Sequence, residues 1–235
     1  MSKVVILDLY TSGLEEKDRI CDIALILEDG HDLQTFSSLC KSPKKIGTEA
    51  MSVHHITNEM LNGSPSFEET LPCQILQEKN CDENLLVSHN SHFDLKMLEK
   101  EGFESHFQVI DTQRCTKALI PECEIFKLQY LRYELLLYKD EKPLAEELGI
   151  DLREHRALSD ALHTQLLYRT LLQYATLSQL IDISANPVLM EKLLFGKYSG
   201  RYIEEIASLD PGYLHWLLAL DDLDEDLAYS IKHYI

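Results

Sequence analysis

Residues 4–13, VVILDLYTSG, are the stretch that most constrains how this chain can fold. Four consecutive apolar residues, three of them β-branched, predict a buried strand, and Ser12-Gly13 predicts its end. Asp8 is therefore expected at the carboxyl end of the strand, where a sheet opens to solvent and a carboxylate can hold a cation. One carboxylate is a poor magnesium site because Mg²⁺ needs further oxygen ligands. A metal site here requires other segments to bring more carboxylates to Asp8.

Composition limits the classes of protein that this chain can be. Its 235 residues, 45% of them hydrophobic, allow one well-cored domain and an appendage. The formal net charge of -18 argues against a broad basic surface, so a polyanion would be held locally by a few cations. The cysteines form no C-x-x-C pair, which favours reduced thiols in a cytosol. No segment resembles a signal peptide or a membrane span, so we expect a cytoplasmic protein without a membrane partner.

Residue patterns along the chain predict an α/β domain with a mixed central sheet. Strands are expected at residues 4–9, 20–28, 33–39, 85–88 and 109–111, with Asp29-Gly30 as a hairpin signal that pairs the second and third strands antiparallel beside the first. Short helical turns are expected in residues 48–61, and helices at 66–77 (interrupted by Pro72), 91–101, 128–137 and 144–148, with a long amphipathic helix at 157–175.

Two segments can supply the further carboxylates. Asp94 opens a helix just after a strand, and Asp160 lies in the first turn of the long helix, with His155 five residues earlier. Taken singly, each carboxylate can equally be a partner for the positive end of its helix dipole. Together with Asp8 they predict a cation site with a titratable base beside it, which two-metal phosphodiester hydrolysis requires.

Three segments resemble the motifs of the DEDDh (DnaQ-like) 3′-to-5′ exonucleases. Residues 8–14, 87–98 and 155–161 are similar to D-x-E-T-T-G-L, H-N-x-x-F-D and H-x-A-x-x-D-A, in that order. Further similarities lie at residues 46–57, the family's segment lining the terminal nucleotide, at 110–112, its third strand, and at 194–200 with 210–217, the C-terminal extension of the exodeoxyribonuclease X group. The resemblance implies a ribonuclease H-like exonuclease domain at residues 1–180 and a small extension at 186–235.

The resemblance also implies a reaction and roles for particular residues. Asp8, Asp94 and Asp160 would hold two divalent ions, Mg²⁺ or Mn²⁺, and His155 would accept a proton from the attacking water. The substrate would be a nucleic acid with a free 3′ end, DNA being favoured, and the products nucleoside monophosphates. Candidates for contacting the substrate are Tyr10, Thr11, Ser12, Gly13, His54, Asn90 and Phe93. Core packing is the alternative for Phe93. We interpret His89 and His92 as solvated loop histidines rather than as a metal pair.

Tyr10 departs from the family pattern, which has glutamate at this position. A phenol, with a pKa near ~10, is neutral at working pH and is a weak ligand for Mg²⁺. We expect weaker metal binding and a misplaced water, with Glu15 and Glu16 pointing elsewhere. Three explanations stay open: a naturally impaired enzyme, an inactivating change, or a site in which water replaces the carboxylate. The alternative function is a catalytically crippled module that binds nucleic-acid ends.

The segment after Asn186-Pro187 is expected to form its own small unit. Gly196 and Gly200 bracket a predicted hairpin that carries Lys197 and Arg201, and Pro211 is expected to start a final amphipathic helix containing Trp216. A contact with phosphate or DNA is the functional interpretation. A cap packed on the domain, with Trp216 as its core, is the structural one, and the two are compatible.

Overall fold

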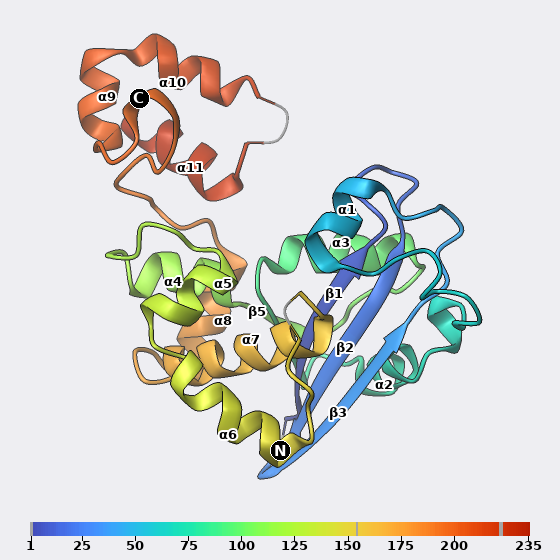
Figure 1. Ribbon diagram of the computed structural model, residues 1–235. Helices are drawn as coiled ribbons and strands as arrows, with labels where there is room; N and C mark the ends of the chain where they lie inside the picture. Colours follow the sequence, from blue (N-terminus) through green and yellow to red (C-terminus); the bar gives the residue numbers. More distant parts are fainter. Residues whose placement is uncertain (1, 154, 221–222) are drawn as a thin grey trace.

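The computed structural model describes residues 2–153, 155–220 and 223–235. A five-stranded sheet with the order β3-β2-β1-β4-β5 forms its centre (Figure 1). The strands are β1 (Val4–Thr11), β2 (Ile20–Asp29), β3 (Asp32–Leu39), β4 (Leu85–Ser88) and β5 (Gln108–Asp111). β1 pairs antiparallel with β2 and parallel with β4, so the sheet is mixed. The predicted α/β class and the antiparallel hairpin are confirmed.

Helices flank the sheet on both faces. In chain order they are α1 (Thr48–His54), the 3₁₀ turn η1 (Phe67–Glu69), α2 (Leu71–Lys79), α3 (Ser91–Lys100), α4 (Thr112–Leu119), α5 (Leu128–Glu134), α6 (Tyr138–Leu148), α7 (Ala157–Leu171) and α8 (Leu177–Ala185). Pro72 interrupts no helix. The Ser66–Glu69 capping box lies at the start of η1, and Thr70 caps the start of a separate helix, α2, which has the proline in its first turn. α4 was not predicted, and α6 begins six residues before the expected start at Leu144 and keeps Pro143 inside.

The two-residue period of β1 decides which side chains face the future site. Val4 and Ile6 belong to the core cluster on the α7 face, whereas Val5 and Leu7 belong to the cluster on the opposite face. Residues 8 and 10 continue the first series. Asp8 and Tyr10 therefore share the face that α7 covers.

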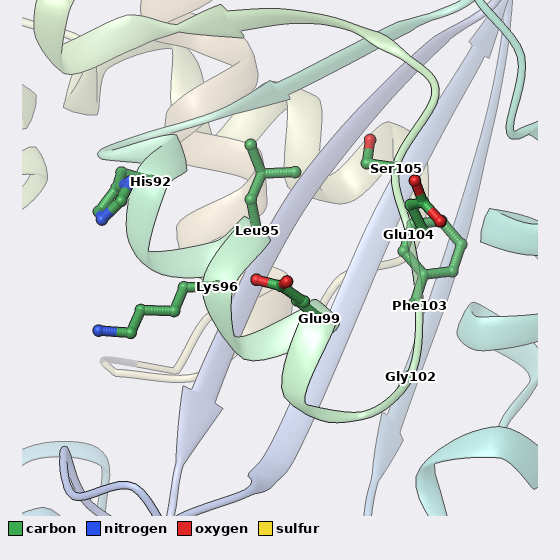
Figure 2. Close-up of a pocket in the computed structure, with 8 residues that line it drawn as sticks. All are labelled: His92, Leu95, Lys96, Glu99, Gly102, Phe103, Glu104 and Ser105. Atoms are coloured by element: carbon green, nitrogen blue, oxygen red, sulfur yellow. The ribbon is translucent and has the colours of Figure 1, made fainter.

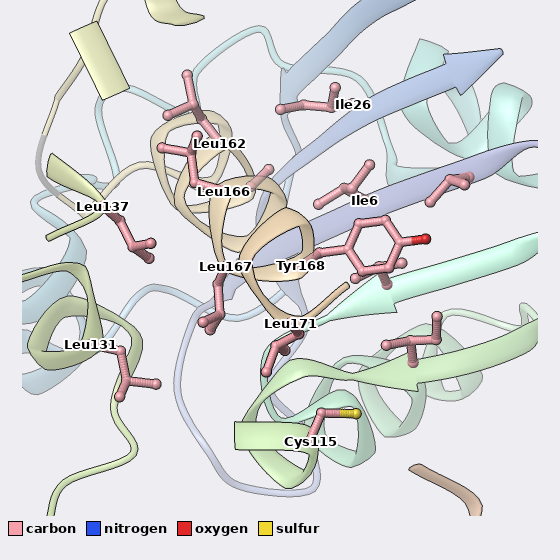
Figure 3. Packing of buried hydrophobic residues seen from close by; sticks show 14 of the residues in the cluster. Ile6, Ile26, Cys115, Leu131, Leu137, Leu162, Leu166, Leu167, Tyr168 and Leu171 are labelled. Carbon is pink, nitrogen blue, oxygen red and sulfur yellow. The ribbon is translucent and has the colours of Figure 1, made fainter. Parts of the chain in front are cut away.

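α7 is buried on nearly every side, which corrects the expectation of an amphipathic helix. Its inner face packs on β1 and β2, and its outer face is covered by residues of α4, α5 and α6. Figure 3 shows Leu166 and Leu167 on this helix with Ile6 on one side and Leu131 on the other. Its buried positions include polar residues as well as leucines, so amphipathic spacing could not report that it is central.

The C-terminal residues form a separate small core. η2 (Gly196–Tyr198), α9 (Ile203–Leu209), α10 (Pro211–Leu218) and α11 (Glu225–Tyr234) enclose Leu193, Ile203, Ile206, Leu214, Leu217, Leu227 and Ile231. In Figure 1 these helices stand apart from the sheet. α10 begins at Pro211 as predicted but is not the final helix. Trp216 is 55% exposed, so the expectation that it forms the core of this unit is wrong. The predicted hairpin is one bridge, Lys192 to Tyr202, around a 3₁₀ turn.

An ionic cluster joins this unit to α4. Asp226 is buried in α11 and lies 3.0 Å from Arg114 Nε and 2.7 Å from Lys117 Nζ through its two oxygens. Its Oδ1 also accepts a hydrogen bond from the Val188 amide.

Across the described ranges, no helix is long and apolar enough to cross a membrane. All six cysteines are free thiols.

Candidate active site

Three carboxylates come together where β1, α3 and α7 meet. Asp8 lies inside β1, three residues before its end rather than at the end as predicted, but beyond the Val4–Ile6 stretch that pairs with β4. Asp94 and Asp160 lie in the first turns of α3 and α7. Burial, followed by the charges of Asp160 and Asp94, raises the pKa of Asp8 well above its usual value. Burial likewise raises the pKa of Asp94. The charges of Asp160 and Asp94 thus act on Asp8 from two other elements of the fold.

Tyr10 points into this group and binds Asp160 directly. Its hydroxyl donates a hydrogen bond to Asp160 Oδ2 at 2.5 Å. Burial and the neighbouring Asp160 charge raise the pKa of Tyr10, so the phenol stays protonated and neutral. Gln129 Nε2 donates to the other oxygen, Asp160 Oδ1, also at 2.5 Å. Both oxygens of Asp160 are thus engaged by neutral donors.

Behind Asp160 lies a ring of polar side chains from α5, α6 and α7. Gln129 Oε1 accepts from Arg132, which forms a two-pronged ion pair with Glu141 at 2.6 and 2.7 Å. Glu141 Oε2 lies 3.2 Å from His163 Nε2, and His163 Nδ1 lies 3.5 Å from Asp160 Oδ1. The ring closes on Asp160 and fixes its orientation. Sequence reasoning missed these residues because none belongs to a recognised motif.

The start of α7 is fixed by a second buried carboxylate. Asp22 on β2 accepts hydrogen bonds from Arg156 Nε at 2.8 Å and from the Ala157 amide at 3.3 Å. It lies opposite Tyr10 in the antiparallel register. This clamp sets the position of Asp160 one turn later, and it holds the residue that follows His155.

His155 lies in the connection that leads into α7, in a left-handed backbone conformation with φ of 54°. Its ring is 6.0 Å from that of His55, which follows α1. Within the described part of the chain, no hydrogen bond or ion pair joins His155 to Asp8, Asp94 or Asp160. In the structure His155 therefore has no direct contact with any of the three acids.

Asp111 is a further residue that positions the site. Its side chain accepts from the amides of Asn90 and Ser91 at the start of α3, and from those of Gln113 and Arg114 at the start of α4. One carboxylate thus caps two helices, and Asn90, the N-cap residue of α3, makes no capping hydrogen bond with its own side chain. Asn90 adopts φ of 67°, which turns the chain from β4 into α3. The resemblance at residues 110–112 gave the only signal for this role.

A cleft of about 530 Å³ opens between the end of β1 and α1, and none of the three carboxylates is part of its lining. Six of the seven expected substrate contacts line it: Tyr10, Thr11, Ser12, Gly13, His54 and Phe93. Asn90 lies outside its lining. Phe93 also packs against the core, so the two interpretations of this residue hold together.

His54 is buried, and both its ring nitrogens are engaged. Nδ1 accepts from the Ile56 amide at 3.0 Å, and Nε2 lies 3.2 Å from the Thr11 carbonyl. Burial lowers the pKa of His54, which favours the neutral ring. His54 also meets the Tyr10 ring edge-on at 5.5 Å. It therefore ties α1 to the end of β1.

Of the two other loop histidines, one differs from the prediction and one agrees with it. His89 is not a solvated residue, because Nδ1 lies 3.0 Å from Thr112 Oγ1 and Nε2 lies 2.8 Å from the Phe126 carbonyl. This part of the prediction is wrong: His89 anchors the connection that precedes α5. His92 is exposed, as expected.

His92 lines a second hollow, of about 700 Å³, on the side of α3 away from Asp94. Figure 2 shows His92 and Lys96 at one end of this hollow and Glu104 and Ser105 at the other. Although it is larger than the cleft, its lining includes none of the expected substrate contacts, so we assign it no part in the chemistry.

The donor set fits a divalent ion only in part. Asp8 is half-buried and Asp94 is buried, and neither has a lysine or arginine partner in the described residues, so their ionised forms would favour a bound cation. Asp160, in contrast, offers no free oxygen, since Tyr10 and Gln129 hold both. The described residues include no group of three or more His, Cys, Asp or Glu side chains arranged to hold a metal ion.

Comparison with known proteins extends over nearly the whole chain. The RNase_T exonuclease family model matches residues 5–168, and the exodeoxyribonuclease X-like C-terminal model matches residues 193–220. Exodeoxyribonuclease 10 of Escherichia coli (strain K12) is 32% identical over 98% of this chain and 97% of its own length. The 3′-5′ exonuclease DinG of Bacillus subtilis (strain 168) is 30% identical over 78% of this chain and 20% of its own.

Among solved structures, exonuclease X in complex with 5′ overhanging duplex DNA has a TM-score of 0.58 and 24% identity. The match covers 78% of this chain and 99% of that one, and it shows a shared fold. The family match and the curated relative agree with the three motifs in the sequence. The chain therefore belongs to the DnaQ-like exonuclease family.

Proposed function

We propose that this chain is a metal-dependent 3′-to-5′ exonuclease that releases nucleoside monophosphates from DNA 3′ ends, and that Tyr10 slows it. The hydrogen bond from Tyr10 to Asp160 is the observation that carries the proposal. The relative named exodeoxyribonuclease 10 and the DNA in the exonuclease X complex support DNA as the substrate. Domain limits of 1–180 and 186–235 and a cytoplasmic location are part of the same proposal.

Asp8 and Asp94 would hold a divalent ion, Mg²⁺ or Mn²⁺, and Asp160 would join them, and help to hold a second ion, once it is released. When bound, such ions polarise the scissile phosphate and stabilise the leaving 3′ oxygen. In this proposal His155 accepts the proton of the attacking water, because imidazole is the side chain best suited to gain and lose a proton near neutral pH. The cleft holds the terminal nucleotide, with Thr11, Ser12, Gly13, His54 and Phe93 beside it, and Asn90 contacts the substrate from outside the cleft.

Tyr10 impairs this arrangement in two ways. It supplies no negative charge where the family has a glutamate, and its hydroxyl occupies an oxygen that a metal ion would need. Glu15 does not compensate, because it is exposed and pairs with Lys44 at 2.8 Å. Activity is therefore expected to be weak at physiological metal concentrations.

The test is single-turnover cleavage of a 3′-end substrate by the natural chain and by Tyr10→Glu across Mg²⁺ and Mn²⁺ titrations. Tyr10→Glu should raise the rate by at least about 10²-fold, as expected for a group that stabilises the transition state. Tyr10→Phe is the matched control, since it frees Asp160 without adding a carboxylate. Equal rates for the natural chain and Tyr10→Glu at every metal concentration would refute the proposed role of Tyr10.

Polarity and metal dependence test the reaction itself. EDTA should abolish cleavage, and a blocked 3′ end should resist while a blocked 5′ end should not. Unchanged digestion of a 3′-blocked, 5′-labelled strand would exclude a 3′-to-5′ exonuclease.

Because both oxygens of Asp160 already accept hydrogen bonds, a second function is favoured, that of a module that binds nucleic-acid ends without cutting them. A gel distinguishes the two. Shortening of a 3′-extended DNA with Mg²⁺ or Mn²⁺ supports the enzyme, and retardation without shortening supports the binding module.

A further inference from the structure

The C-terminal unit carries a continuous row of side chains, Lys197, Tyr198, Tyr213 and Trp216, which we call the aromatic ridge. The rings of Tyr198 and Tyr213 meet edge-on at 5.2 Å, and those of Tyr213 and Trp216 lie 5.5 Å apart, tilted by 36°. Lys197 Nζ lies 4.6 Å from the centre of the Tyr198 ring. One end of the ridge is therefore a cation and the other an indole.

The ridge has a built geometry rather than a chance arrangement. Asp210 accepts from the Tyr198 hydroxyl at 2.8 Å and from Lys197 Nζ at 3.1 Å, and it caps α10, which carries Tyr213 and Trp216. Beneath it, Gly196 has φ of 69°, and a Cβ there would lie 2.5 Å from the Tyr213 hydroxyl. Only glycine allows the turn and the close approach together.

Trp216 is left out of the hydrophobic core that surrounds it. The neighbours Leu214 and Leu217 are fully buried in this unit, whereas the indole is half exposed. The core is thus complete without the tryptophan. A large aromatic side chain that packs on one other ring and otherwise faces solvent is available to a ligand.

Two further cations belong to the same unit as the ridge, although this unit is acidic, like the chain as a whole. Arg201 is exposed, and its guanidinium has no partner among the residues that the structure describes. Lys192 lies 5.1 Å from the ring of Tyr202, a second exposed aromatic. Flat rings beside cations match the two chemical features of a single nucleic-acid strand, its bases and its phosphates.

We propose that the aromatic ridge binds a single-stranded segment of nucleic acid, with a base stacked on Trp216 and phosphates near Lys197 and Arg201. The proposal rests on the proposed function only in taking nucleic acid as the ligand. It adds a second contact, outside the cleft, which the ionic cluster at Asp226 holds at a fixed place relative to the nuclease domain.

Trp216 is the chain's only tryptophan, so its fluorescence reports directly on the ridge. The experiment titrates the full chain with oligothymidylate in EDTA, which prevents cleavage. Saturable quenching is expected, with affinity that falls as salt rises. The double variant Lys197→Gln/Arg201→Gln should weaken binding by roughly tenfold. Lys232→Gln, which removes an exposed cation from α11 of the same unit, is the matched control and should bind normally.

Trp216→Leu provides an independent measurement by anisotropy of a labelled oligothymidylate. Loss of one stacked base should lower affinity by roughly tenfold. Circular dichroism must show that the variant is folded.

Unchanged Trp216 emission at oligonucleotide saturation, or quenching by blunt duplex alone, would overturn the inference. So would equal losses in the Lys232→Gln control. Cleavage by Tyr10→Glu is measured separately. If this variant cleaves DNA but Trp216 fluorescence does not respond to oligothymidylate, binding to the aromatic ridge is refuted and the proposed function is not affected.

Discussion

The ionic cluster between α4 and α11 predicts how strongly the C-terminal unit is held. Asp226→Asn keeps the shape of the side chain but removes the charge that faces Arg114 and Lys117. The Asp226 side chain is 3% exposed and that of Lys117 is 7%, so the cations stay buried with less compensation. Breaking a buried pair costs about 3–5 kcal/mol, and the remaining contacts of Asp224 and Glu225 reduce this to about 2–4 kcal/mol.

Urea unfolding followed by two signals measures this cost. Trp216 fluorescence reports on the C-terminal unit, and far-ultraviolet circular dichroism is dominated by the rest of the chain. With a dependence of about 1–3 kcal/mol per molar urea, Asp226→Asn should lower the fluorescence midpoint by roughly 1 M or more. Glu225→Gln is the control: this side chain is 69% exposed, so its loss should cost under about 1 kcal/mol. Equal shifts for the two variants would refute the assignment of docking to the buried cluster.

Three further outcomes are expected. In the Tyr10→Glu protein, His155→Ala should lower the turnover number by roughly 10²- to 10⁴-fold with DNA affinity nearly intact, whereas loss of binding alone would make His155 a positioning residue. The thermal stability of the unsubstituted chain should change little when EDTA is added. Tyr10→Glu should be less stable than the unsubstituted chain in EDTA, and its free energy of unfolding should rise by about 2.7 kcal/mol at a Mg²⁺ concentration 100-fold above the Kd. Burial acts to raise the pKa of Asp18, but hydrogen bonds from Ser12 and Lys44 outweigh it and lower the pKa. Its stabilising effect is therefore present above its unfolded pKa of about 3.9 and is lost as pH falls through the lower folded value, so Asp18→Asn should flatten the acid limb of stability against pH.

Features set by local spacing could be predicted from the sequence. The two-residue period of β1 places Asp8 and Tyr10 on one face, and the order of strand, turn and helix places Asp94 at a helix start. These relations involve residues close together in the chain, and the three motifs then align them with a known fold.

Long-range polar contacts could not be predicted. Gln129 has no motif and no unusual neighbours, yet it binds Asp160 across 31 positions of the chain. In the sequence His89 is typical of a solvated loop histidine, and only the fold brings the Phe126 carbonyl within hydrogen-bonding distance of its ring. Trp216 is as hydrophobic as its buried neighbours, and only the packing of α9 and α11 against α10 decides that it is left outside. Composition and periodicity carry no information on such choices.

Tyr10 and Gln129 together stabilise the buried Asp160 carboxylate with hydrogen bonds. A buried carboxylate needs either an opposite charge or enough hydrogen bonds to replace its hydration. Asp160 obtains both its hydrogen bonds from neutral donors, and Arg132 and Glu141 lie one step further out. A glutamate at position 10 would replace a donor with another anion, so the site would then require metal for its stability as well as for its chemistry. Tyr10, which we propose slows cleavage, therefore also makes the shape of Asp160's surroundings less dependent on metal than a glutamate would.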